Sequence, residues 1–116
     1  MPARVKIVVF VPESHADRLR EAIGRAGAGI IGNYSHCTFT TKGTGRFLPM
    51  DGANPRIGKV GKLEEVQEER IETVCSRDHL DNVLQAIREV HPDEEIAFDV
   101  YPVEEVIMPK RSSESC

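Results

Sequence analysis

The chain alternates between apolar runs typical of buried strands and apolar stripes typical of amphipathic helices. Valine, isoleucine and phenylalanine dominate residues 5–11, and a β-branched run of this kind that ends at Pro12 predicts a buried strand. Over residues 19–26 the apolar residues recur at helical spacing with charged residues between them. This second pattern predicts a helix that packs one apolar face on a sheet.

Polar and glycine residues mark where this helix is expected to begin and end. Ser14 and Asp17 have the spacing of a capping box, in which side chains satisfy the unpaired N–H groups of the first turn. Gly27 and Gly29 follow the last apolar position and are expected to stop the helix.

A second strand is predicted over residues 34–41, which are rich in aromatic and β-branched residues. Side chains alternate across a strand, so His36 and Cys37 are expected on opposite faces. Glycine and proline then recur throughout residues 42–62, a density that predicts a long loop. Loops of this length are commonly functional or mobile.

The segment from Lys62 to Cys75 carries two conflicting patterns. Leu63, Val66 and Arg70 have helical spacing, whereas alternate residues from Gln67 onward fit one face of a strand. Periodicity alone does not decide between them.

The last third of the chain is expected to form a helix and a strand. Asp78 is a candidate N-cap, and a marked apolar stripe then runs to the residue before Pro92. Residues 96–103 have strand-like composition. A single domain is therefore predicted over residues 1–109, followed by a flexible polar tail over residues 110–116.

If the ambiguous segment is a strand, the element order is βαββαβ, the α+β arrangement of ferredoxin-like domains. Both helices then cover one face of a four-stranded antiparallel sheet. The other face, with Val8 and Phe10, is left uncovered. An apolar sheet face without cover usually marks an interface, so self-association is expected.

Composition narrows the class of protein. The 116 residues are 40% hydrophobic and 29% charged, a balance that predicts a folded chain and not a disordered one. A net charge of −4 with scattered basic residues gives no electrostatic footprint for nucleic acid or an anionic membrane, and no apolar run is long enough to cross a bilayer. Cys37, Cys75 and Cys116 form no CxxC pair, which favours a reducing cytoplasm.

The predicted loop combines glycines with cations. Backbone N–H groups freed by glycine can cradle an anion or phosphate. Equally, the glycines can serve tight turns while the cations remain solvated, and no Walker-type phosphate motif is present. These two interpretations stay open for a candidate ligand-binding set: Lys42, Gly43, Gly45, Arg46, Asn54, Arg56, Gly58 and Lys59.

His36 and Cys37 are the candidate metal ligands, because imidazole and thiolate bind transition metals. Opposite faces of a strand would keep them from sharing one ion, and a hydrogen-bonded histidine beside a core cysteine is the simpler interpretation. His15, His79 and His91 fall at predicted helix ends, where solvent or capping roles are ordinary. No nucleophile motif is present, so a catalytic role is not expected.

The blocks Gly32–Cys37, Gly43–Gly45 and Gly52–Pro55, followed by Ile57 and Gly58, resemble the bacterial YqfO branch of the NGG-interacting-factor-three family. The resemblance covers nearly the whole chain and is to the domain inserted in the middle of those proteins, which is similar in fold to PII signalling proteins and CutA. It implies a strand for residues 62–75, a trimer, and a ligand region comparable to the nucleotide site that PII proteins form between subunits. The two-metal centre of the family lies in flanking halves, so its ligands cannot be transferred to this chain.

The sequence therefore predicts a non-catalytic, homotrimeric binding or regulatory module whose ligand is a small anion or a protein partner. The alternative is a metal-binding protein of the CutA kind, with a transition metal as its candidate cofactor. A metal-dependent hydrolase is a third and disfavoured hypothesis, since it rests only on the parent family.

Overall fold

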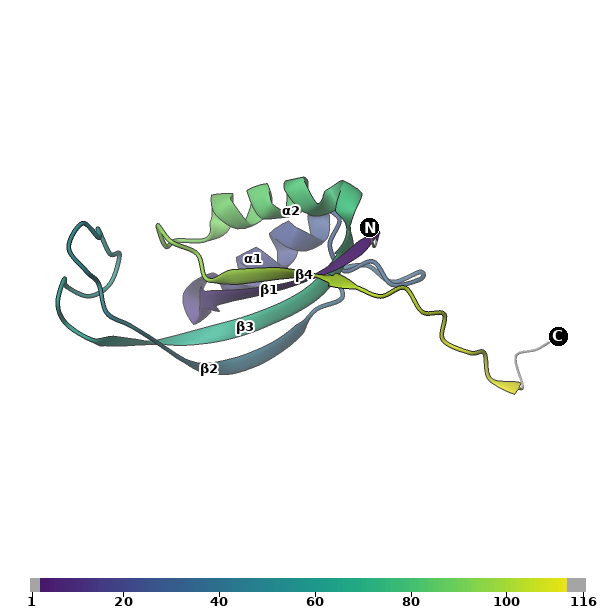
Figure 1. The fold of residues 1–116 in the computed structure, drawn as a ribbon, viewed down its shortest axis with the longest axis horizontal. Coiled ribbons are helices and arrows are strands. Elements are labelled where there is room, and N and C mark those ends of the chain that lie inside the picture. Colours follow the sequence, from purple (N-terminus) through teal and green to yellow (C-terminus); the bar gives the residue numbers. More distant parts are fainter. Residues whose placement is uncertain (1–2, 113–116) are drawn as a thin grey trace.

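The computed structural model describes residues 3–112 and shows a single sheet covered on one face by two helices (Figure 1). Every neighbouring pair of strands is antiparallel, and the strand order is β2-β3-β1-β4. The expected βαββαβ order and ferredoxin-like α+β class are confirmed. The elements are β1 (Arg4–Pro12), α1 (Glu13–Arg25), β2 (Phe39–Phe47), β3 (Glu64–Ser76), α2 (Arg77–Val90) and β4 (Phe98–Val103).

The hydrophobic core lies between the sheet and the helices. Alternate residues of β1 point toward the helices, as the period of a strand requires, and the apolar stripes of α1 and α2 meet them. The central buried residues are Val5, Ile7, Val9, Val11, Leu19, Ile23, Ile71, Val83 and Ile87. The strand and helix stripes predicted from the sequence are thus the ones that form the core.

The helix ends differ in part from the prediction. Pro12 precedes α1 without a side-chain cap, and Ser14 Oγ instead lies 2.8 Å from His15 Nδ1, so the predicted capping box is wrong. Asp78 lies inside the first turn of α2 and is not its N-cap. Gly27 does end the first helix: its φ is 110°, and the N–H of the next residue returns to the carbonyl of Ile23, as in a Schellman motif.

The second strand lies further along the chain than predicted. It begins at Phe39 and runs through Gly43 and Gly45, which the sequence placed in a loop. His36 has a φ of 61°, a left-handed conformation that no strand residue adopts, and the N–H of Cys37 bonds to the carbonyl of Gly29. These local bonds hold the preceding segment out of the sheet, while pairing with β3 keeps the glycines in it.

The ambiguous segment is a strand, as the family resemblance implied. β3 pairs with β1 on one side and with β2 on the other, so it lies inside the sheet and supplies hydrogen bonds to both neighbours. Its buried residues Ile71, Thr73 and Cys75 alternate on the helix side. Sheet pairing decides a conformation that the residue pattern left open.

No element among residues 3–112 covers the face of the sheet away from the helices, but this face is less apolar than expected. Val8 is only 1% exposed, and Glu72, the residue paired with it on β3, forms ion pairs with Lys6 and Arg70 on this face. Arg70 also lies 5.7 Å from the centroid of the Phe10 ring. The expectation of a bare apolar surface is therefore wrong at Val8.

Exposed aromatic residues flank this charged centre. Phe39 on β2 pairs with Glu72 and is 69% exposed, and Tyr101 on β4 pairs with Lys6 and is 44% exposed. Both belong to the open face, because directly paired residues share a face of the sheet. The outer strands thus carry the apolar surface that remains.

Beyond β4 the chain leaves the body as an extension, here defined as residues 104–112 (Figure 1). Its apolar residues Val106, Ile107 and Met108 are almost fully exposed. Of the predicted tail over residues 110–116, residues 113–116 lie outside the described part. No helix among the described residues has the length and apolar character needed to cross a membrane.

Candidate functional site

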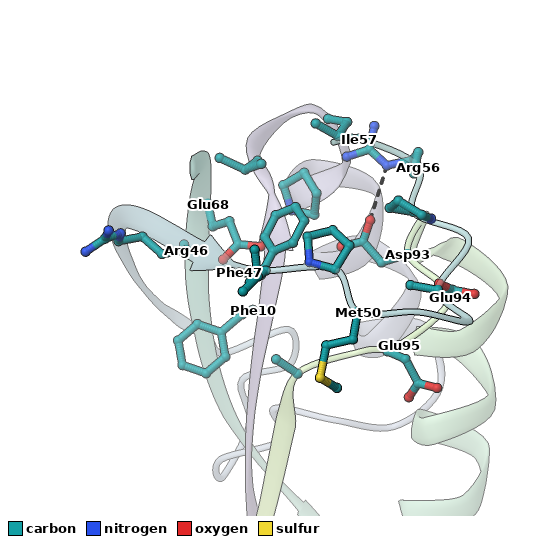
Figure 2. Close-up of a pocket in the computed structure, with 18 residues that line it drawn as sticks. Phe10, Arg46, Phe47, Met50, Arg56, Ile57, Glu68, Asp93, Glu94 and Glu95 are labelled. Carbon is teal, nitrogen blue, oxygen red and sulfur yellow. Dashed lines mark hydrogen bonds and ion pairs between the residues drawn. The ribbon is translucent and has the colours of Figure 1, made fainter. Parts of the chain in front are cut away.

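A cleft of about 400 Å³ lies at one end of the sheet, between the loop that joins β2 to β3 and the connection that joins α2 to β4 (Figure 2). Its walls are mostly apolar, with carboxylates at the rim. The apolar lining is Phe10, Pro12, Phe47, Leu48, Pro49, Met50, Ala53, Pro55, Ile57, Val66 and Ala97. A volume of this size is in the range of small-molecule sites.

Two contacts fasten the loop over the cleft. The backbone N–H of Asn54 donates to Glu94 Oε2 at 2.8 Å, and Arg56 Nε donates to Asp93 Oδ1 at 3.2 Å (Figure 2). Arg88 in α2 donates in turn to the carbonyls of Asp93 and Glu94. The cleft therefore has two walls that are held to each other and to the second helix.

His91 sets the position of the α2 to β4 connection. It is 5% exposed, its Nε2 lies 2.7 Å from the carbonyl oxygen of Phe10, and the N–H of Asp93 donates to its Nδ1 at 3.2 Å. This pattern requires the neutral tautomer with the proton on Nε2. His91 is the C-cap residue of α2, with its N–H bonded to the carbonyl of Ile87, as a capping role requires. The solvent role expected for it is wrong, because the ring is buried and joins β1 to the cleft wall.

Glu68 is a carboxylate that is half-buried without a polar partner among the described residues. It lies half-buried on β3 within the cleft lining, and no hydrogen bond or ion pair engages it within residues 3–112. Burial raises the pKa of Glu68, and the nearby negative charge of Asp93 adds to the effect. A side chain on Gly45 would overlap Glu68 Oε1, so the glycine leaves the room that this carboxylate occupies.

The residues predicted for ligand binding are only partly gathered at the cleft. Gly45, Arg46 and Arg56 line it, but Arg56 is paired with Asp93, and Arg46 points away and pairs with Glu65 at 3.2 Å (Figure 2). Four carboxylates, from Glu68, Asp93, Glu94 and Glu95, line the same space. The cleft is thus acidic, unlike the anion cradle that the sequence left open.

The other predicted residues lie around the cleft. Lys42 and Gly43 line an adjacent hollow of about 260 Å³ on the open face. Gly58 lies against Glu64, and Lys59 is exposed on the loop. Sequence patterns missed Glu68 and the α2 to β4 connection, because nothing in the local sequence shows that they meet the loop.

His36 and Cys37 lie before β2 and not on a strand. His36 Nε2 is 3.7 Å from Glu21 Oε2, and its ring covers Gly24 of α1. The carbonyl of Cys37 accepts a hydrogen bond from Thr73 Oγ1 at 2.8 Å. Among residues 3–112, no three histidine, cysteine or acidic side chains form a group able to hold a metal ion.

The chain is similar in sequence to one segment of several longer proteins. It is 56% identical over 98 residues to a protein of Halalkalibacterium halodurans and 50% identical over 100 residues to one of Bacillus subtilis, both named GTP cyclohydrolase 1 type 2 homolog. These matches cover 84% and 86% of this chain but only 26% and 27% of the relatives. No model of a known protein family matches the chain.

The same similarity to a segment of a longer protein is found among solved structures. A Bacillus cereus protein related to NIF3 has a TM-score of 0.78 at 48% identity, covering 90% of this chain and 26% of its own. CutA1 from Shewanella has a TM-score of 0.67 and Bacillus subtilis GlnK one of 0.56, at 14% and 18% identity, with 86% and 84% of those chains covered. By sequence and structure, the chain is similar to one segment, about a quarter of the length, of proteins named GTP cyclohydrolase 1 type 2 homolog and of a protein related to NIF3, and it has the fold of CutA and GlnK.

Proposed function

We propose that the chain is a non-catalytic, cytoplasmic binding module of the PII and CutA kind that works as a homotrimer. The observation that carries this proposal is the apolar cleft, whose loop is fastened to the α2 to β4 connection by Asn54 and Arg56. A cleft with clamped walls and apolar lining is built to hold a ligand or a peptide segment. The acidic rim favours an occupant that combines an apolar body with a positive charge.

Self-association is supported by the open face and by the outer strands. The helices leave one face of the sheet uncovered, and Phe39 and Tyr101 expose aromatic rings there. β2 lies at the edge of the sheet, and its nine residues have no neighbouring strand on one side within the described part of the chain. Exposed edges and aromatic patches are surfaces that a second copy covers well. The family resemblance favours three copies.

A matched pair of variants tests this proposal. Phe39→Asp places a charge on the open face, whereas Tyr34→Asp changes a residue that is 75% exposed and lies outside the sheet. On analytical size exclusion at micromolar concentration, we expect the Phe39 variant to elute as a smaller species than the wild type. The Tyr34 variant should elute with the wild type. Identical elution of all three as monomers would contradict the proposal.

A further inference from the structure

The extension exposes three consecutive large apolar side chains without cover from the body. Val106, Ile107 and Met108 are 80%, 92% and 83% exposed. Single exposed apolar residues are common, but a continuous apolar segment held in water is typical of a surface that binds a partner. Lys110 follows two residues later and adds a positive charge to the segment.

The cleft matches this segment in both polarity and charge. Its floor and walls are apolar, and its rim carries Glu68 and Glu95, which make no ion pair within the described residues. A segment with the order Val-Ile-Met-Pro-Lys would place apolar side chains on apolar walls and an ammonium group near an unpaired carboxylate. A nearby positive charge stabilises the ionised carboxylate and so offsets the cost of its partial burial.

The geometry of β4 favours a second copy as the source of the segment. Ala97, just before β4, lines the cleft, whereas the extension leaves the opposite end of that strand after Val103. Six residues of strand separate the two points, which is about 20 Å at the usual rise. From there the extension runs away from the body, at the end opposite the loop that joins β2 to β3 (Figure 1). That loop forms one wall of the cleft.

We propose that residues 106–110 of one copy dock in the cleft of a neighbouring copy, with Ile107 and Met108 against its apolar walls and Lys110 beside Glu68. This contact joins the extension of one copy to the cleft of the next. Copies that repeat such a contact form a closed ring when the rotation between neighbouring copies divides a full turn evenly. This inference rests on the self-association in the proposed function and names the partner of the cleft.

Cross-linking between isotopically distinct chains tests the inference directly. A photoreactive benzoylphenylalanine replaces Ile107 in full-length ¹⁴N chain, which is mixed with ¹⁵N wild-type chain, irradiated and analysed by peptide mass spectrometry. We expect cross-links that join the two isotopes and map to residues 47–57 of the neighbour. The same group at Tyr34, an exposed residue remote from the cleft lining, should not yield them. Cross-links to the cleft of the same chain, or to other surfaces only, would overturn the inference.

Exchanging the charges of Glu68 and Lys110 distinguishes specific docking from non-specific hydrophobic association. Glu68→Lys or Lys110→Glu alone should lower the cross-link yield several-fold, while the double variant Glu68→Lys/Lys110→Glu should restore it. Equal yields in all four proteins would contradict the assigned pair. Light scattering on the same samples distinguishes the two proposals: a trimer without these cross-links removes only the docking, whereas a monomer removes the proposed function as well.

Discussion

The carboxylate of Glu68 occupies the space that a side chain on Gly45 would need. The two residues lie on adjacent strands, β3 and β2, and both line the cleft. Gly45 has no left-handed backbone angle, so its strand conformation does not require glycine. The small residue at this position is therefore explained by the carboxylate that lies over it.

Gly45→Ala tests the cleft without disturbing the fold. The added methyl group must move the end of a flexible glutamate side chain and no backbone atom, so the free energy of unfolding should change by less than about 1 kcal/mol. The displaced carboxylate should weaken docking of the extension by about tenfold, or about 1.4 kcal/mol. Urea unfolding and the cross-linking assay measure the two effects. An unchanged cross-link yield would show that docking of the extension does not depend on the position of the Glu68 carboxylate.

Gly29→Ala provides the structural contrast. Gly29 has a φ of 81°, and a Cβ there would lie 2.6 Å from the backbone nitrogen and oxygen of Cys37. Left-handed backbone costs about 1–2 kcal/mol for other residues, and the backbone overlap adds to it. We expect a loss of about 2–3 kcal/mol in the free energy of unfolding, measured in urea. A loss as small as that of Gly45→Ala would contradict this account of the segment before β2.

The raised pKa of Glu68 gives a pH-dependent prediction. Because burial and Asp93 raise the pKa in the folded chain, ionisation of Glu68 disfavours folding. The penalty is absent below the ordinary value of 4.5 and is fully present above the raised folded value. Glu68→Gln should therefore shift the urea midpoint upward at pH 7 and leave it unchanged at pH 3.5.

Two controls keep this measurement specific. Both proteins should also carry Ile107→Asp, so that docking of the extension does not contribute. Glu65→Gln changes an exposed carboxylate on the same strand that is paired with Arg46, and it should give no gain at pH 7. A gain from Glu68→Gln that persists at pH 3.5 would assign the effect to shape and not to charge.

The ion pair between Arg20 and Glu69 joins α1 to the sheet. Arg20 Nη1 lies 2.6 Å from Glu69 Oε1 and 3.2 Å from Thr40 Oγ1, and Glu69 is 6% exposed. Arg20→Ala leaves a buried carboxylate without its partner and should cost about 3 kcal/mol in the free energy of unfolding. The double variant Arg20→Met/Glu69→Leu should recover most of this loss in chemical denaturation. Equal losses in both variants would contradict the role of an unpaired charge.

The sequence predicts the parts of the fold that depend on local pattern. The β-branched run of β1 and the apolar stripe of α2 form the expected elements, because their period is also the period of burial. The limits of β2 were not predictable, since Gly43 and Gly45 indicate a turn until β3 pairs with them. The site depends on such distant contacts, and Glu68 and His91 gain their roles only when strands and loops meet.

The central claim is that copies of this chain cover one another. Sedimentation equilibrium of the wild-type chain over a series of concentrations from 1 to 100 micromolar tests it most directly. The account predicts a mass of three times the 12.9 kDa of one chain across the upper part of this range. A mass of one chain at every concentration would contradict it.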